Sequence, residues 1–209
     1  MKPARAGAGA RDEPTLALAT AAAWSAWLAE QHGRSRGALL RLTKRSGRGT
    51  ATGAGALTYA EALEVALAWG WIDSQKRALD DGAWLQRFTP RGPQSPWSKI
   101  NRAKAEALIT RGAMKPPGLA EVERARRDGR WARAYDGARA STVPVDLATA
   151  LGRNARARAF FETLDAANRY AILYRVQTAK RAETRAERIS RFVAMCARHE
   201  TIHPPRRAR

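Results

Sequence analysis

Pro144 divides the sequence into two parts with different hydrophobic patterns. Beyond it, apolar residues recur at the three- and four-residue spacing of a helix face. The pattern predicts helices over residues 145–151, 155–164, 167–181 and 183–198. We therefore expect an all-α module over 144–200, followed by a basic tail over 201–209.

The part before Pro144 mixes helical and alternating segments. Residues 1–14 are rich in Gly, Ala and Arg and predict a disordered tail. After it, the periodicity predicts helices over 20–31, 58–69, 95–111 and 119–127, strands over 38–43, 71–73 and 83–89, and a flexible loop over 46–56. Residues 15–143 thus predict an α+β domain, in which a small antiparallel sheet packs with helices. The whole chain predicts a helix-rich α+β fold.

Two of these helices have distinctive starting residues. In Thr58-Tyr-Ala-Glu61 the threonine side chain can accept a hydrogen bond from the third helical N–H while Glu61 reaches back, which is a capping box. In Ser95-Pro96 the serine is a typical helix cap, and proline is favoured at the first helical position. The sequence therefore predicts that helices begin at these two places.

The chain is strongly basic. Its 209 residues include 38 Lys and Arg against 19 Asp and Glu, for a formal net charge of +19. Such a charge invites a nucleic-acid partner. The cations are mostly Arg in an Ala- and Gly-rich chain, as a GC-rich genome produces, and they are spread along the sequence. Non-specific nucleic-acid binding is therefore an alternative that the sequence does not favour.

Cysteine usage and hydropathy indicate the compartment. Cys196 is the only cysteine, so no disulfide framework exists, which fits a reducing environment. No apolar run approaches the length of a membrane span. We expect a cytoplasmic protein without a membrane span.

One catalytic pattern occurs in a context that does not suit it. His199-Glu-Thr-Ile-His203 matches the zinc-protease pattern H-E-x-x-H, but Pro204 disfavours helical geometry at the second histidine. The glycines between 47 and 55 fit no phosphate-binding motif. We expect no metal and no cofactor, and the sequence identifies no catalytic residue.

Two stretches, 69–73 and 86–101, are denser in polar and aromatic residues than a core requires. If the strands pair, these residues gather donors at the entry of a helix, where free N–H groups favour an anion. The candidates for binding a small anionic ligand are Trp71, Asp73, Arg87, Arg91, Ser95, Trp97, Ser98 and Asn101.

A structural interpretation of the same residues stays open. In it, Ser95 caps the helix, Trp97 packs in the core, and Asp73 pairs with Arg87 or Arg91 to hold the loop to the sheet. A second set of candidates for binding is Lys180, Thr184, Arg185 and Arg188. A solvated helical hairpin with internal salt bridges explains most of that second set.

Several boxes of the sequence resemble a known family. They are Trp24-x-x-Trp27-Leu28, Gly70-Trp71-Ile72-Asp73, Leu85-Gln-Arg-Phe-Thr-Pro-Arg91, Ser95-Pro-Trp-Ser-Lys-Ile-Asn101, Gly118-Leu119 and Gly129-Arg-Trp131. They look like the YdeI/OmpD-associated family. The end of the chain, Arg169-Tyr-Ala-Ile-Leu-Tyr174 through Arg188-Ile189, resembles the small helical OmdA domain. The resemblance covers roughly residues 20–204.

This resemblance implies a bacterial, non-secreted protein linked by name to bacteriocin protection and to an outer-membrane porin. It implies no established reaction, cofactor or catalytic residue. Two positions depart from the family pattern, which often has Pro at Ala182 and a second Arg at Gly92. The first departure favours a continuous helix across 181–183, and the second weakens the anion interpretation of the loop.

Three functional hypotheses follow. The leading one is a non-enzymatic binding protein with a stress or bacteriocin-protection role, acting on a small anionic ligand or a protein partner. The alternative is an enzyme or small-anion-binding protein that acts at the loop over 87–101. The third is a non-specific nucleic-acid binder.

Overall fold

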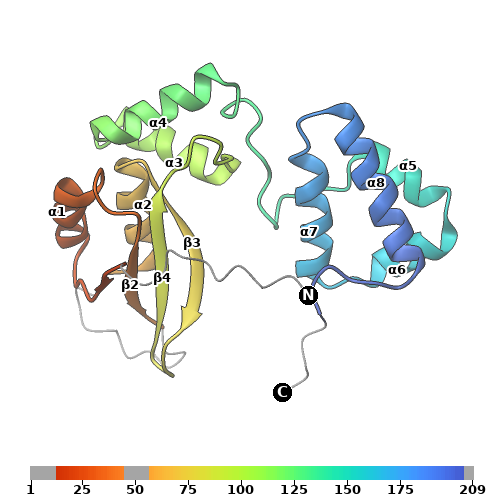
Figure 1. Cartoon of the computed structure of the whole chain (residues 1–209), viewed down its shortest axis with the longest axis horizontal. Helices are drawn as coiled ribbons and strands as arrows, with labels where there is room; N and C mark the ends of the chain where they lie inside the picture. Colours follow the sequence, from red (N-terminus) through yellow and green to blue (C-terminus); the bar gives the residue numbers. More distant parts are fainter. Residues whose placement is uncertain (1–12, 45–56, 205–209) are drawn as a thin grey trace, which may run out of the picture. The chain divides into compact units, whose positions relative to one another are not determined.

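The computed structural model describes residues 13–44 and 57–204 (Figure 1). The chain forms two compact units, the first made of Met1–Trp97 and Asn101–Arg133, the second of Ser98–Ile100 and Ala134–Arg209. The predicted loop over 46–56 lies outside the described residues, as do most of the predicted tail over 1–14 and the end of the tail over 201–209. The fold is helix-rich α+β, as the sequence predicts.

Unit 1 contains a four-stranded sheet in the order β1-β2-β4-β3. The strands are β1 (Thr15–Leu16), β2 (Ala38–Thr43), β3 (Trp71–Ala78) and β4 (Ala83–Pro90). The predicted antiparallel pairing holds for β2 with β4 and for β4 with β3, but β1 runs parallel to β2, so the sheet is mixed. A two-residue strand is too short to show alternation. β3 is longer than predicted: its second half is exposed and polar, so the sequence gives no alternating pattern there, but it pairs with β4.

Helices α1 (Ala21–Gln31) and α2 (Tyr59–Ala68) cover one face of this sheet (Figure 1). The ring of Trp24 in α1 lies 6.1 Å from Trp71 and 5.7 Å from Phe88, and its Nε1 donates to the carbonyl of Ala62. The predicted capping box at the start of α2 is confirmed: the Thr58 side chain accepts from the backbone N–H of Glu61, whose carboxylate accepts from the N–H of Thr58.

The starts of α3 (Lys99–Thr110) and α4 (Pro116–Arg127) differ from the prediction. Ser95 does not cap α3, because its hydroxyl accepts from the N–H of Gly92 at 3.1 Å and closes a turn before the helix. The predicted start at Ser95-Pro96 is therefore wrong by one turn. The helix predicted over 119–127 begins earlier, because residues 116–118 already belong to α4: proline lacks the N–H that a first turn leaves unused.

Unit 2 contains α5 (Val145–Gly152), α6 (Ala155–Thr163), α7 (Ala166–Gln177) and α8 (Ala182–Ala197). Their apolar faces share one core, formed by Leu147, Leu151, Ala157, Phe161, Ile172, Leu173, Val176, Ile189, Phe192 and Cys196. Cys196 is buried, and burial raises the pKa of its thiol.

The break between α7 and α8 corrects one expectation. α7 ends at Gln177 rather than at 181, and no continuous helix crosses 181–183. Thr178 caps the end of α7, where its hydroxyl and its N–H both donate to the carbonyl of Tyr174. The chain must turn there because the apolar face of α8 packs with α5 and α6.

Candidate functional site

Arg91 and Trp97, two of the predicted site residues, lie together. The guanidinium carbon of Arg91 lies 3.7 Å from the centroid of the Trp97 ring, and Arg91 donates to the carbonyl of Pro96 at 3.3 Å. Both residues are buried, with exposed fractions of 5% and 1%. Trp97 also meets Trp131 edge to face, with ring centroids 4.8 Å apart. A cation–π contact is stronger in such a desolvated setting than at a surface.

Ser95 belongs to the same loop. Its carbonyl accepts from Arg130 at 2.8 Å, and Arg130 is held in turn by the carboxylate of Asp128. The hydrogen bonds from Arg130 to the carbonyl of Ser95 and from Arg91 to the carbonyl of Pro96 therefore fix the backbone of this loop. The backbone of Ser98 forms an isolated parallel β-bridge with that of Tyr135, and Asn101 lies in the first turn of α3.

The strand residues of the predicted site have other partners. Asp73 accepts from the hydroxyl of Tyr59 at 2.8 Å, and burial together with this bond raises the pKa of Tyr59. Arg87 pairs with Glu13, whose pKa is lowered by that bond. Asp73 lies opposite Phe88 in the sheet, so the adjacent Arg87 points to the other face. Among the described residues, Asp73 pairs with neither Arg87 nor Arg91.

Trp71 lies on the same face as Asp73 but within the core, with an exposed fraction of 1%. Its ring meets those of Trp24 and Trp27 edge to face, and its Nε1 donates to the carbonyl of His32 at 3.3 Å. The structure therefore brings Arg91, Ser95 and Trp97 into one loop, while Trp71, Asp73 and Arg87 each have separate partners in the sheet.

The second predicted set lies at the start of α8. Arg185 donates to both carboxylate oxygens of Asp146, at 2.6 and 2.9 Å, and to the carbonyl of Val176. This bond lowers the pKa of Asp146. Arg188 donates to the carbonyl of Arg175, Thr184 is half-buried, and Lys180 is exposed. Arg185 and Arg188 thus tie α8 to α5 and α7.

The H-E-x-x-H pattern does not lie on a helix. α8 ends at Ala197, and His199 has a positive φ of 60°. The His199 ring stacks on Phe160, while the backbone of His203 pairs with the side-chain amide of Asn168. The two imidazoles are therefore not presented by one helical face, as the zinc-protease pattern requires. Over residues 13–44 and 57–204, no three His, Cys, Asp or Glu side chains gather in a metal-binding group.

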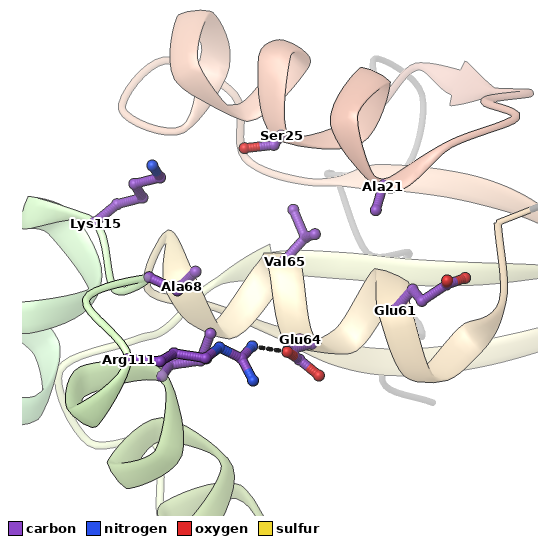
Figure 2. Close-up of a pocket in the computed structure, with 10 residues that line it drawn as sticks. Ala21, Ser25, Glu61, Glu64, Val65, Ala68, Arg111 and Lys115 are labelled. Atoms are coloured by element: carbon purple, nitrogen blue, oxygen red, sulfur yellow. Dashed lines mark hydrogen bonds and ion pairs between the residues drawn. The ribbon is translucent and has the colours of Figure 1, made fainter.

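A pocket that the sequence did not predict lies in unit 1. It has a volume of about 320 Å³ (Figure 2). It is lined from α1, α2, the end of α3 and the connection to α4 by Ala21, Ser25, Glu61, Glu64, Val65, Ala68, Leu108, Arg111, Ala113 and Lys115. Known ligand pockets begin at about 300 Å³ and combine apolar walls with a few polar groups, so this one is large enough for a small molecule.

A close contact between helices shapes one end of the pocket. The N–H of Lys115 donates to the carbonyl of Ala68 at 3.0 Å, which joins the start of α4 to the end of α2. At Gly118 a Cβ atom would lie 2.2 Å from that same carbonyl oxygen, so only glycine allows the approach. This contact places Lys115 at the pocket.

The charged groups around the pocket differ in how they are engaged. Arg111 pairs with Glu64, which links the segment after α3 to α2 at one side of the pocket (Figure 2). The Glu61 carboxylate accepts hydrogen bonds from Thr58 in the capping box, and these bonds lower the pKa of Glu61. Ser25 accepts from the indole N–H of Trp69 at 3.0 Å. The Lys115 side chain is exposed.

Comparison with known families assigns the two parts of the chain separately. Residues 16–121, about half of the 209, match a domain of unknown function, DUF8412. Residues 140–199 match the OmdA family, described as Bacteriocin-protection, YdeI or OmpD-Associated. The chain therefore carries a DUF8412 domain and, after it, an OmdA domain of the YdeI/OmpD-associated family.

The OmdA match falls within unit 2 and includes α5 to α8. It is narrower than the expected 20–204, and the pocket residues lie in the DUF8412 match instead. Searches of curated proteins and of solved structures give no match. Across the described ranges, no helix has both the length and the hydropathy of a membrane span.

Proposed function

We propose that this protein is a non-enzymatic, cytoplasmic binding protein with a stress or bacteriocin-protection role, and that it binds a small ligand in the pocket of unit 1. The bacteriocin-protection role rests on the description of the OmdA family. The observation that supports a ligand is the pocket itself, whose apolar lining from Val65, Ala68 and Leu108 is bordered by charged side chains.

Binding fits the pocket better than catalysis does. A general acid or base works best with a pKa near the operating pH. The pKa of Glu61 is lowered, and Glu64 is neutralised by Arg111. These carboxylates are therefore held as structural partners, which suits a rigid binding site.

Filling the pocket tests this function. Ala21→Phe puts a ring into the pocket, whereas Ala22→Phe adds the same ring to the exposed side of α1 as a matched control. Ligands found in a thermal-shift screen of small metabolites should raise the melting temperature of the wild type and of Ala22→Phe, because they bind the folded state. Ala21→Phe should abolish that shift. A screen without hits, or hits that Ala21→Phe still binds, would contradict the proposal.

The alternative is an anion site at the loop around Arg91. One observation favours it: the Nε1 of buried Trp97 has no acceptor within the described part of the chain. Inorganic phosphate and citrate belong in the same screen for this reason. Binding of either anion that Arg91→Ala abolishes and Ala21→Phe preserves would place the function at the loop.

A further inference from the structure

We infer that the pocket binds a small monocarboxylate with an apolar body, whose acid group meets Lys115 and Ser25. This ligand class rests on the proposed function, because it presupposes that the pocket is occupied. Three observations carry it: the apolar lining, the state of the charged groups, and the position of two hydrogen-bond donors at one end of the pocket.

The apolar body of the ligand would lie on small and aliphatic side chains. Ala21, Val65, Ala68, Leu108 and Ala113 line the pocket, from three helices and the segment that follows α3. A volume of about 320 Å³ lies at the lower end of the range known for ligand pockets. An alkyl chain or a single aromatic ring of that size therefore fits and removes apolar surface from water.

The acid group is selected by donors at the other end of this lining. Figure 2 shows the Lys115 side chain and the Ser25 hydroxyl turned toward the same end of the pocket, away from Glu61. Ser25 already accepts from Trp69, so its own O–H is left to donate. Within the described part of the chain, the Lys115 ammonium forms no ion pair. A carboxylate can accept from both groups.

The remaining charges leave Lys115 as the cation that a ligand meets. Arg111 is neutralised by Glu64. The Glu61 carboxylate is bound by the N–H and the hydroxyl of Thr58 at the start of α2, where the helix dipole also favours it. An amine at that end of the pocket would compete with the cap, whereas a carboxylate at Lys115 displaces no protein partner.

A matched ligand series tests the class. Hexanoate and benzoate are compared with hexylamine and with hexanol by amide chemical-shift titration of the full-length protein. The carboxylates should shift the amides of α1, α2 and residue 115, with dissociation constants on the order of 0.1 to 1 mM for ligands of this size. The amine and the alcohol should bind at least about fivefold more weakly, because they lack the charge that Lys115 selects.

Variants locate the acid group. Lys115→Ala should weaken hexanoate binding about five- to tenfold, Lys115→Arg should retain most of it, and the control Lys104→Ala, on α3 outside the pocket, should leave it unchanged. Since the Lys115 contact that shapes the pocket uses its backbone N–H, these variants keep the fold. If Lys115→Ala binds hexanoate as tightly as the wild type does, the inference is wrong.

The failure of this inference differs from the failure of the proposed function. If hexanol or hexylamine binds as well as hexanoate, and Ala21→Phe abolishes that binding, the pocket is a ligand site but the carboxylate class is wrong. If none of the four probes shifts the pocket amides, and the metabolite screen gives no hit that Ala21→Phe removes, both ideas fail.

Discussion

At the scale of single residues, the sequence identifies which side chains are unusual better than it identifies their partners. Arg87 and Asp73 stand out in the sequence, and their proximity along the chain invites a mutual ion pair. The pleat of the sheet places them on opposite faces instead, where Arg87 meets Glu13 and Asp73 meets Tyr59. Glu13 lies 74 positions before Arg87, and no local pattern connects the two.

The pair between Glu13 and Arg87 predicts a pH-dependent stability. The hydrogen bond from Arg87 holds the pKa of Glu13 below its ordinary value of 4.5, so the folded state binds this proton less readily than the unfolded state. The stabilisation is therefore complete above about pH 4.5 and is lost as the pH falls through the folded pKa. Glu13→Gln should lower the free energy of unfolding by about 1–2 kcal/mol at pH 7, because the pair is mostly buried.

Urea unfolding at pH 7 and at pH 3.5 measures this effect. The difference in the free energy of unfolding between the wild type and Glu13→Gln should be smaller at pH 3.5 than at pH 7. The control Glu162→Gln, on the exposed side of α6, should change the free energy of unfolding little at either pH. A gap that stays constant between the two pH values would show that ionisation of Glu13 does not stabilise the fold.

At the scale of helices and strands, the local sequence predicts where an element starts or stops at a cap better than it predicts how long the element is. The capping box at Thr58 and the left-handed glycines 70 and 112 could be placed from the sequence, because each satisfies a requirement of the backbone nearby. The length of β3 and the start of α4 could not be. β3 continues through exposed polar residues because β4 supplies its hydrogen bonds, and α4 starts early because α2 holds Lys115.

Gly118 tests that contact between α4 and α2. Glycine in a helix ordinarily destabilises it by about 1 kcal/mol relative to alanine, so Gly118→Ala would stabilise an isolated helix. Here the new Cβ would lie 2.2 Å from the carbonyl oxygen of Ala68, and we expect a net loss of about 2 kcal/mol in the free energy of unfolding. Gly33→Ala is the control, since no atom lies within 4 Å of its Cβ position. A gain in melting temperature for Gly118→Ala would refute the close approach.

At the scale of the whole molecule, the pocket shows the limit of local patterns. Its lining comes from segments between Ala21 and Lys115 that meet only in the folded state, and alanine has no distinctive sequence signature. Gly118, whose missing side chain lets α4 approach α2, gives no signal either, because the sequence predicts that helix only from residue 119. The candidate loop over 87–101 can be proposed from the sequence because its residues are neighbours along the chain, and the structure brings two of them, Arg91 and Trp97, together.

The net charge of +19 carries the last prediction. Many arginines form ion pairs or bind carbonyl groups within the protein, as Arg87, Arg111 and Arg185 do, so fewer cations are available to phosphates than the composition implies. Binding to a random DNA duplex should therefore be weak and indifferent to sequence, and should fall steeply between about 0.05 and about 0.2 M salt as counterion release is lost. Fluorescence anisotropy across this range measures it, with the Ala21→Phe variant as a control that leaves the charge unchanged. Tight binding that survives about 0.2 M salt would mean that the exposed cations form a specific interface, and the nucleic-acid hypothesis would then displace the pocket as the account of what this protein binds.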